Sequence, residues 1–297
     1  MSQLLFTRIG IAVLAAIVTL TSVSCSTASS SNLHLKPINP TSTTNSIAAK
    51  PKIVVNPKLI EANTRFSFNL FSKILKQDGK NVFVSPSSVA ISLSMVHNGA
   101  KGETRQAIAK ALEMQGMSLS EINQANASLK TSLESSDPGV QLTIANSLWA
   151  RKGVDFKPEF IQRNQTFYAA EVESLDFADP SAPGQINGWV KKITQGKISE
   201  IVDRIDADQV MFLINAIYFK GKWMTEFDKS QTTDRPFNLA NGRQKQHPMM
   251  SQKGEYRYYE TQQFQAVSLA YGKGRTSLYV FLPKPNSSLA EFQKTLT

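Results

Sequence analysis

The chain of 297 residues carries 33 Lys or Arg and 23 Asp or Glu, and its formal net charge at pH 7 is +10. The length fits one large domain or two small ones, and a hydrophobic content of 41% supports a packed core. The one cysteine, Cys25, excludes an intramolecular disulfide, so the fold depends on packing. The positive charge would favour acidic partners. Because no run of five or more basic residues occurs, we interpret it as a solubilising excess without a nucleic-acid partner.

Residues 1–25 have the pattern of an export signal. Arg8 supplies the positive charge, Ile9–Leu20 is an apolar stretch too short for a membrane span, and small residues precede Cys25. The end of this stretch resembles a bacterial lipoprotein cleavage site, in which the cysteine becomes lipidated, although Ser22 stands where a large aliphatic residue is usual. Lipidation of Cys25 and ordinary cleavage nearby are both open. We therefore expect an exported protein, extracellular or periplasmic, either free or anchored to the membrane.

A linker separates this signal from the folded domain. Residues 26–56 are rich in Ser, Thr, Asn and Pro and contain few large apolar side chains. Such a segment cannot bury enough surface to offset its chain entropy, so we expect it to be disordered. The folded domain is expected to cover residues 57–297.

The domain is predicted to open with two helices around a short strand. Apolar residues recur at helical spacing over Leu59–Asp78, and Asn81–Val84 has the composition of a strand. Ser85 and Pro86 then form a strong helix start, because serine caps the helix and proline needs no hydrogen-bond donor at the first helical position. That second helix would end at Asn98-Gly99.

Five further elements follow in the same pattern of spacing and turn residues. We predict helices over 102–112, 119–133 and 159–168, and strands over 140–150 and 170–177. The strand over 140–150 alternates, which places Leu142, Ile144 and Leu148 on one face.

The central element is Val210–Phe219, which is apolar at every position except Asn215. A run rich in Ile, Phe, Tyr and Leu fits a strand buried on both faces. A helix of that length is the competing interpretation, and Lys220-Gly221-Lys222 directly after the run argues against it. The flanking elements are predicted to be a helix over 186–193, a meander of strands over 256–260, 264–270 and 276–282, and a helix beginning at 288–296.

No catalytic or cofactor-binding motif occurs in the chain. The three histidines, His34, His97 and His247, fall in the linker, at a helix end and in a Gln-His-Pro turn. Gly-x-Ser-x-Gly, Ser-x-x-Lys, His-Glu-x-x-His and a phosphate-binding glycine loop are all absent from the sequence. We therefore expect a protein that is not an enzyme and that uses no cofactor or metal.

Three polar residues are the candidates for a functional site: Ser85, Ser88 and Asn215. A buried amide costs a few kcal/mol unless its hydrogen bonds are made. The two hydroxyls, at a strand-to-helix junction, could satisfy the amide of Asn215. The alternative is a helix cap and a separate structural asparagine.

Two segments resemble one protein family at fixed spacing. NAIYFKGKW at Asn215–Trp223, with Pro248-Met249-Met250 after it, and NVFVSPSSVAISLSMVHNGAKGETR at Asn81–Arg105 are similar to the serpins, which are mainly suicide inhibitors of serine and cysteine proteases. The resemblance covers about Pro57–Thr297. It implies an α+β fold in which helices pack around a large mixed β-sheet, with a second, smaller, barrel-like sheet.

The same resemblance implies roles for four residues. Ser85, Ser88 and Asn215 match the polar cluster beneath the main sheet, the shutter, where the central strands part. Trp223 matches the tryptophan at the top of that opening, the breach. In the family, a protease cleaves an exposed reactive loop, which then inserts into the sheet as a new strand and traps the protease.

The resemblance ends before roughly the last third of the family's core. In the family, that part holds a strand beside the one matched by Val210–Phe219, the reactive loop and a histidine of the polar cluster. We therefore expect a C-terminally truncated serpin that lacks the reactive bond, is inactive in this form and self-associates through unpaired sheet edges. A full-length inhibitor would have a serine or cysteine protease as its partner. The alternatives are a non-inhibitory serpin-fold binding protein or chaperone, and a degenerate gene product.

Overall fold

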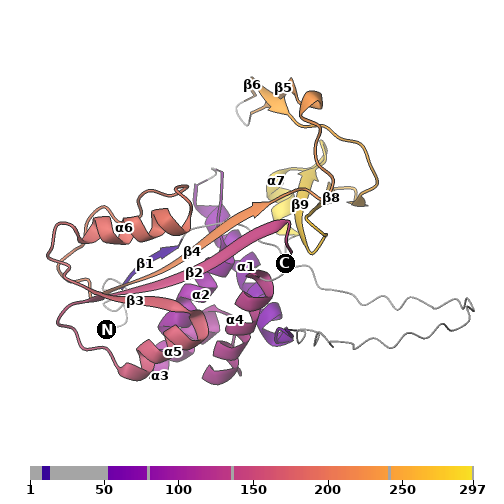
Figure 1. Cartoon of the computed structure of the whole chain (residues 1–297). Helices are drawn as coiled ribbons and strands as arrows, with labels where there is room; N and C mark the ends of the chain where they lie inside the picture. Colours follow the sequence, from indigo (N-terminus) through magenta and orange to yellow (C-terminus); the bar gives the residue numbers. More distant parts are fainter. Residues whose placement is uncertain (1–8, 14–52, 79–80, 135–136, 240–241, 296–297) are drawn as a thin grey trace, which may run out of the picture.

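A four-stranded mixed sheet forms the centre of the molecule (Figure 1). The computed structural model describes residues 9–13, 53–78, 81–134, 137–239 and 242–295. The strand order is β1-β4-β2-β3, in which β4 runs antiparallel to β2 and parallel to β1, and β2 runs parallel to β3. The bounds of these strands are β1 (Ile9–Val13), β2 (Val140–Arg151), β3 (Ala170–Leu175) and β4 (Met211–Gly221).

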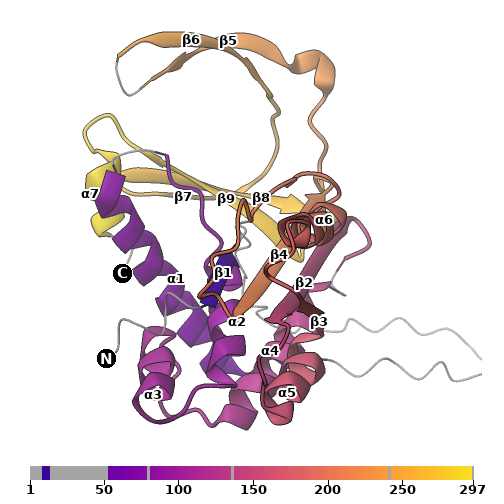
Figure 2. The ribbon, with the colours of Figure 1, turned by 90° about the vertical axis from the view of Figure 1, so that its left-hand side faces the viewer.

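Helices cover both faces of this sheet. One face is covered by α6, and α2, α4 and α5 lie against the other, as the two ribbon views show (Figure 2). The helices are α1 (Pro57–Asp78), α2 (Pro86–His97), α3 (Gly102–Ala111), α4 (Leu119–Glu134), α5 (Pro158–Tyr168), α6 (Ala182–Ile193) and α7 (Leu289–Lys294). The helices and most strands predicted from apolar spacing are thereby confirmed, within a few residues at each end.

Two smaller sheets follow the main one in the chain. An antiparallel pair is formed by β5 (Thr233–Asn238) and β6 (Gln244–Met249), after the short 3₁₀ turn η1 (Lys229–Gln231). The predicted meander is present as β7 (Arg257–Glu260), β8 (Phe264–Tyr271) and β9 (Thr276–Pro283). Among the described residues these sheets are open ladders of two and three strands, so a barrel-like closure stays a prediction.

Helix starts follow the capping rules that the sequence suggested. Ser85 caps α2 by accepting a hydrogen bond from the Ser88 N–H at 3.3 Å, with Pro86 at the first helical position. The Asn56 side chain accepts one from the Lys58 N–H at 3.0 Å, at the start of α1. These caps provide acceptors for N–H groups that have no partner within the helix.

Both faces of β4 are buried, as its unbroken apolar sequence predicted. Met211, Leu213 and Ile217 belong to a core that α2 and α5 share with β2. The alternate residues, Phe212, Ile214 and Ala216, pack with α6. Because side chains alternate along a strand, Asn215 lies on the same face as Leu213, toward α2.

The edge of β4 that does not face β2 is paired with β1. The register runs from Ile9 opposite Met211 to Val13 opposite Asn215. The strand lies inside the stretch predicted as the apolar part of an export signal. The prediction of an export signal rested on the length of that stretch and on its flanking residues. Neither feature can reveal pairing with a strand some 200 residues later in the chain.

One local expectation is wrong, and one pair of strands was not predicted. Asn81–Val84 was predicted to be a strand, but residues 81–85 have no regular structure, and the Phe83 side chain is exposed. A strand needs a neighbour for its backbone hydrogen bonds, and the described part of the chain provides none there. The pair of β5 and β6 was not predicted, because nearly all of its residues are exposed, most are polar, and no apolar alternation marks it.

The described residues contain no helix long and apolar enough to cross a bilayer. Cys25, most of residues 1–25 and most of the predicted linker at residues 26–56 lie outside the described residues. The domain start expected near Pro57 coincides with the first residue of α1.

Candidate functional site

Asn215 lies in the middle of β4 and is fully buried. Its Nδ2 donates a hydrogen bond of 2.8 Å to Oδ1 of Asn146, the residue directly opposite on β2. Its Oδ1 has no hydrogen-bond partner among the described residues. An unpartnered buried acceptor is costly, so this atom marks a position where a donor would be stabilising.

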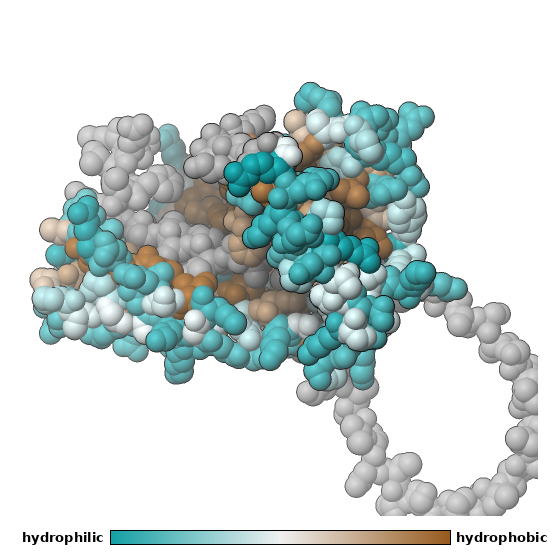
Figure 3. Space-filling model, turned by 90° about the horizontal axis from the view of Figure 1, so that it is seen from above, coloured by the Kyte–Doolittle hydropathy of each residue, from teal (hydrophilic) through white to brown (hydrophobic). Residues whose placement is uncertain are grey.

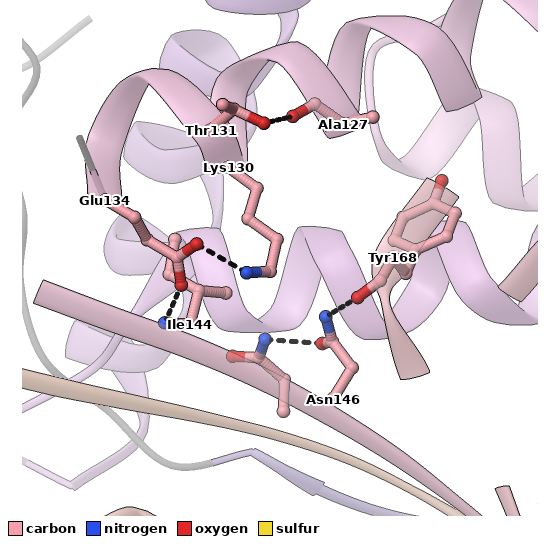
Figure 4. Close-up of polar contacts among 8 residues, drawn as sticks. Ala127, Lys130, Thr131, Glu134, Ile144, Asn146 and Tyr168 are labelled. Carbon is pink, nitrogen blue, oxygen red and sulfur yellow. Dashed lines mark hydrogen bonds and ion pairs between the residues drawn. The ribbon is translucent and has the colours of Figure 1, made fainter. Parts of the chain in front are cut away.

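Asn146 continues the polar contacts toward the helices (Figure 4). Its Nδ2 donates to the backbone carbonyl of Tyr168, the last residue of α5, at 2.7 Å. The Tyr168 hydroxyl donates to Asn123 Oδ1 on α4 at 2.9 Å and accepts from Asn126 Nδ2 at 3.4 Å. Burial raises the pKa of the Tyr168 phenol, so the ring stays neutral and can donate.

The series then crosses to the end of α2. Asn123 Nδ2 donates to Asn98 Oδ1 at 2.8 Å, and Asn98 Nδ2 donates to Asn164 Oδ1 on α5 at 2.8 Å. Asn164 Nδ2 lies 3.4 Å from the Met95 carbonyl, which accepts its hydrogen bond. All of these side chains are less than 5% exposed.

Ser85 and Ser88 form a pair at the start of α2, where both are fully buried. Ser85 Oγ donates to Ser88 Oγ at 3.0 Å and accepts from the Ser88 N–H. Of the two interpretations left open by the sequence, these contacts fit the helix cap with a separate structural asparagine, because Ser85 bonds within the cap and the Asn215 Nδ2 bond goes to Asn146. Helix α2 nevertheless packs against β4, so the serine pair and Asn215 belong to one layer of contacts.

Trp223 lies just beyond the end of β4 and forms an aromatic group with two neighbours. Its ring stacks on Tyr271 at a centroid distance of 4.4 Å, and Phe227 meets it edge-on at 5.6 Å. An isolated bridge pairs the backbones of Trp223 and Tyr271. The group joins the end of the central strand to β8 of the meander.

Asp137 makes a further contact with the turn that follows β8. Its carboxylate accepts hydrogen bonds from the backbone N–H groups of Lys273 and Gly139, and these two bonds, in that order, lower the pKa of the carboxyl. Gly272 has φ +52, and a Cβ there would lie 2.4 Å from Asp137 Oδ1. Glycine is therefore required at that turn.

The comparison with protein families decides the identity of this fold. The family described as serpin (serine protease inhibitor) matches residues 61–297, which include β4, the serine pair and the polar series. The chain belongs to the serpin family. Serpins are protease inhibitors rather than enzymes, in agreement with the absence of catalytic motifs from the sequence.

Individual serpins are similar over most of this chain. The bovine (Bos taurus) leukocyte elastase inhibitor is 36% identical over 233 residues, which are 76% of this chain and 61% of the relative. Human (Homo sapiens) Serpin B8 is 36% identical over 246 residues, 80% of this chain and 65% of the relative. The crystal structure of tengpin, a thermophilic serpin in the native state, superposes with a TM-score of 0.75 at 32% identity, over 82% of this chain and 62% of tengpin. The chain thus spans less than two thirds of the length of these serpins.

Sequence reasoning found one end of the polar series and missed the rest. Asn146 could have been found, because it is the polar position among Leu142, Ile144 and Leu148 on one face of a predicted strand. Asn123 and Asn164 lie within helices where an asparagine is usually exposed. No spacing in the sequence shows that they meet.

We expect the serpin fold to lose stability as pH falls through the range in which His97 titrates. The side chain is 4% exposed, and burial first, with the charge of Arg105 second, lowers its pKa. The unfolded chain, in which histidine has a pKa of about 6.5, therefore binds a proton at a higher pH than the folded one. Stability falls as pH drops below that value and is restored as it rises.

Urea unfolding between pH 5 and pH 8 measures this effect. His97→Gln should flatten the pH dependence relative to the unmodified protein, because the titrating group is gone. Arg105→Gln should also make the loss of stability at low pH smaller, because without that charge the folded-state pKa of His97 lies closer to its unfolded value. The reduction should be less than in His97→Gln, because Arg105 is only the secondary cause. Identical slopes for His97→Gln and the unmodified protein would contradict the assignment.

Proposed function

We propose that this chain provides the strand-accepting part of a serpin-type inhibitor of serine or cysteine proteases. The observation that carries the proposal is the central strand β4, buried on both faces and containing the fully buried Asn215. Its outer edge pairs with a strand at Met211–Asn215, so that edge has the geometry to accept strand addition. In this proposal Asn215, Ser85 and Ser88 form the shutter, and Trp223 marks the breach.

The proposal assigns the cleaved bond to a reactive loop outside these 297 residues. The matched residues account for 61% of the bovine leukocyte elastase inhibitor and 65% of human Serpin B8. No segment of this chain resembles the family's reactive loop. We therefore propose that the 297 residues alone do not inhibit a protease.

Incubation with an elastase-type serine protease tests both parts of this proposal. The purified chain is expected to leave protease activity unchanged and to form no covalent complex that survives denaturing electrophoresis. A chimera of residues 57–297 followed by the unmatched C-terminal part of human Serpin B8 is expected to form such a complex, because β4 and its shutter would then have a loop to accept. The intact human protein is the positive control.

Each outcome of this experiment has a definite meaning. A covalent complex with the 297-residue chain would overturn the proposed inactivity. A folded chimera that is only cleaved as a substrate would overturn the inhibitory role and favour the non-inhibitory binding protein. Cooperative unfolding of the chimera establishes that it is folded.

The proposal includes export of the protein. Its support is the charge and apolar pattern of residues 1–25, which resembles a secretory signal. Lipidation of Cys25 and ordinary cleavage remain the two alternatives, and membrane fractionation of the Cys25→Ala variant distinguishes them. A lipid-anchored protein would leave the membrane fraction after this substitution, and an ordinarily cleaved protein would be soluble with and without it.

Self-association is part of the same proposal. Large apolar side chains of β9 are 40 to 61% exposed: Leu278, Val280, Phe281 and Leu282. Brown apolar residues are visible between the polar ones in the space-filling view (Figure 3). The outer edge of β9 has no neighbouring strand among the described residues. Exposed apolar residues on such an edge strand favour association. Light scattering of the eluting protein would show oligomers, and a purely monomeric peak would contradict this part.

A further inference from the structure

The buried polar side chains between β4 and the helices all donate their hydrogen bonds in one direction, away from β4. From Asn215 each group donates to the next, and the order is Asn215, Asn146, Tyr168, Asn123, Asn98, Asn164 and the Met95 carbonyl. We call these six side chains the amide relay. The relay consists of two hydrogen-bonded runs, one from Asn215 to the Tyr168 carbonyl and one from the Tyr168 hydroxyl to the Met95 carbonyl. Within each run the bonds are arranged head to tail and polarise one another, and the two runs are joined only by the Tyr168 residue itself.

The two ends of the amide relay differ in one respect that matters. At the helical end, the Met95 carbonyl of α2 accepts the last hydrogen bond. At the strand end, Asn215 Oδ1 is buried and has no donor among the described residues. A donor that reached this atom would satisfy Asn215 and strengthen the cooperative bonds from Asn215 through Asn146 to the Tyr168 carbonyl.

Tyr168 is the residue through which the relay passes from sheet to helices. Its backbone carbonyl holds Asn146 of β2, and its hydroxyl holds Asn123 of α4. The side chain is 2% exposed, and a phenol ring has only two rotatable bonds. Because the ring is closely packed and has few rotamers, we expect a displacement at one of these bonds to shift the other.

A second contact ties the same helix to the same strand. Glu134 Oε1, in the last turn of α4, accepts the backbone N–H of Ile144 on β2 at 2.8 Å, and its other oxygen pairs with Lys130 (Figure 4). Ile144 precedes the part of β2 that pairs with β3, which begins at Asn146. Helix α4 is thus bonded to β2 directly through Glu134, and it is connected to Asn146 of β2 indirectly through Tyr168 of α5.

We infer that the amide relay is a conformational coupling device, in which the hydrogen-bonding state of Asn215 in the central strand and the packing of α2, α4 and α5 control each other. Breaking the relay in the helices makes local opening of β4 easier, although within the described part of the chain no hydrogen bond joins Asn98 or Asn123 to that strand. A donor bound to Asn215 Oδ1 makes local opening of α2, α4 and α5 harder. This inference does not depend on protease inhibition by the chain.

Hydrogen–deuterium exchange of the full chain tests the coupling. Asn123→Ala removes the acceptor of the Tyr168 hydroxyl and the donor to Asn98. We expect backbone amides of Met211–Ile217 in β4 to exchange about three- to tenfold faster in this variant. Tyr168→Phe removes one hydroxyl and keeps the carbonyl that binds Asn146, and it should give the same effect on β4.

The double variant separates coupling from general destabilisation. Because both substitutions cut the same link, Tyr168→Phe with Asn123→Ala should speed exchange in β4 no more than the larger single effect. The amides of α1 and α3, which lie outside the relay, should be unchanged. The inference would be overturned if the two accelerations of amide exchange multiplied in the double variant. It would also be overturned if exchange became equally faster throughout the protein, or if exchange in β4 did not change.

Asn187→Ala is the matched control. Asn187 on α6 also uses its side-chain oxygen within the protein, accepting the N–H groups of Ile201 and Val202 at 2.9 and 3.0 Å. It lies outside the relay and on the other face of the sheet. Its replacement should speed exchange around residues 201–202 and leave α4 and α5 unchanged, whereas faster exchange in α4 and α5 would show that any lost amide has the effect assigned to the relay.

Discussion

Replacing Asn146 by leucine is expected to destabilise the protein by about 2–4 kcal/mol. The substitution removes the only acceptor found for Asn215 Nδ2, and Asn215 Oδ1 already has no donor among the described residues. A fully buried amide would then have no hydrogen bond at either atom. The Tyr168 carbonyl would also lose its donor. Urea unfolding at low protein concentration, where association does not contribute, measures the change.

A second substitution shows whether the unpartnered amide is the cause. In the Asn146→Leu background, Asn215→Leu replaces the unpartnered group by an apolar one of similar size. Removing both members of a buried polar pair is much less costly than removing one. The double variant should therefore be more stable than Asn146→Leu alone, and additive losses would show that the polar pair is not the source of the effect.

The helices and the main sheet could be predicted because apolar spacing encodes burial. In β4 the unbroken apolar run implies two buried faces, and the structure packs Leu213 and Ile214 into different cores. The strand expected at Asn81–Val84 failed for the opposite reason, since its residues favour a strand but no described neighbour completes it. The β5–β6 pair was missed because its pairing rests on backbone hydrogen bonds between exposed polar residues.

The candidate site was predictable only where a polar residue interrupts an apolar pattern. Asn215 stands out in its strand, and its sequence pattern requires a hydrogen-bond partner without naming it. The partner, Asn146, is set by the register between β2 and β4, which depends on contacts between residues 69 positions apart. Ser85 could be recognised as a helix cap from its sequence, and it is one.

The second large effect is expected from Leu213→Ala, which should cost about 3–5 kcal/mol. Leu213 is 0% exposed, and so is Leu148, which lies directly opposite it on β2. Collapse of the cavity would require a shift of β4, but the next residue, Ile214, is held in the core beneath α6. A strand packed on both faces cannot move toward one without opening the other, so most of the cavity should remain.

Leu282→Ala provides the matched comparison, since Leu282 is the same residue type in a strand but is 61% exposed. Its replacement should change stability by less than about 0.5 kcal/mol in urea unfolding. A loss below about 1 kcal/mol for Leu213→Ala would show that α2 and α5 do not close over β4. The amide relay could then not couple β4 to the helices, because Asn215 projects from β4 toward the same helices as Leu213. If Leu213→Ala cost much stability and Asn146→Leu little, the packing of β4 would be confirmed. The conclusion that the buried polar pair controls β4 would then be contradicted.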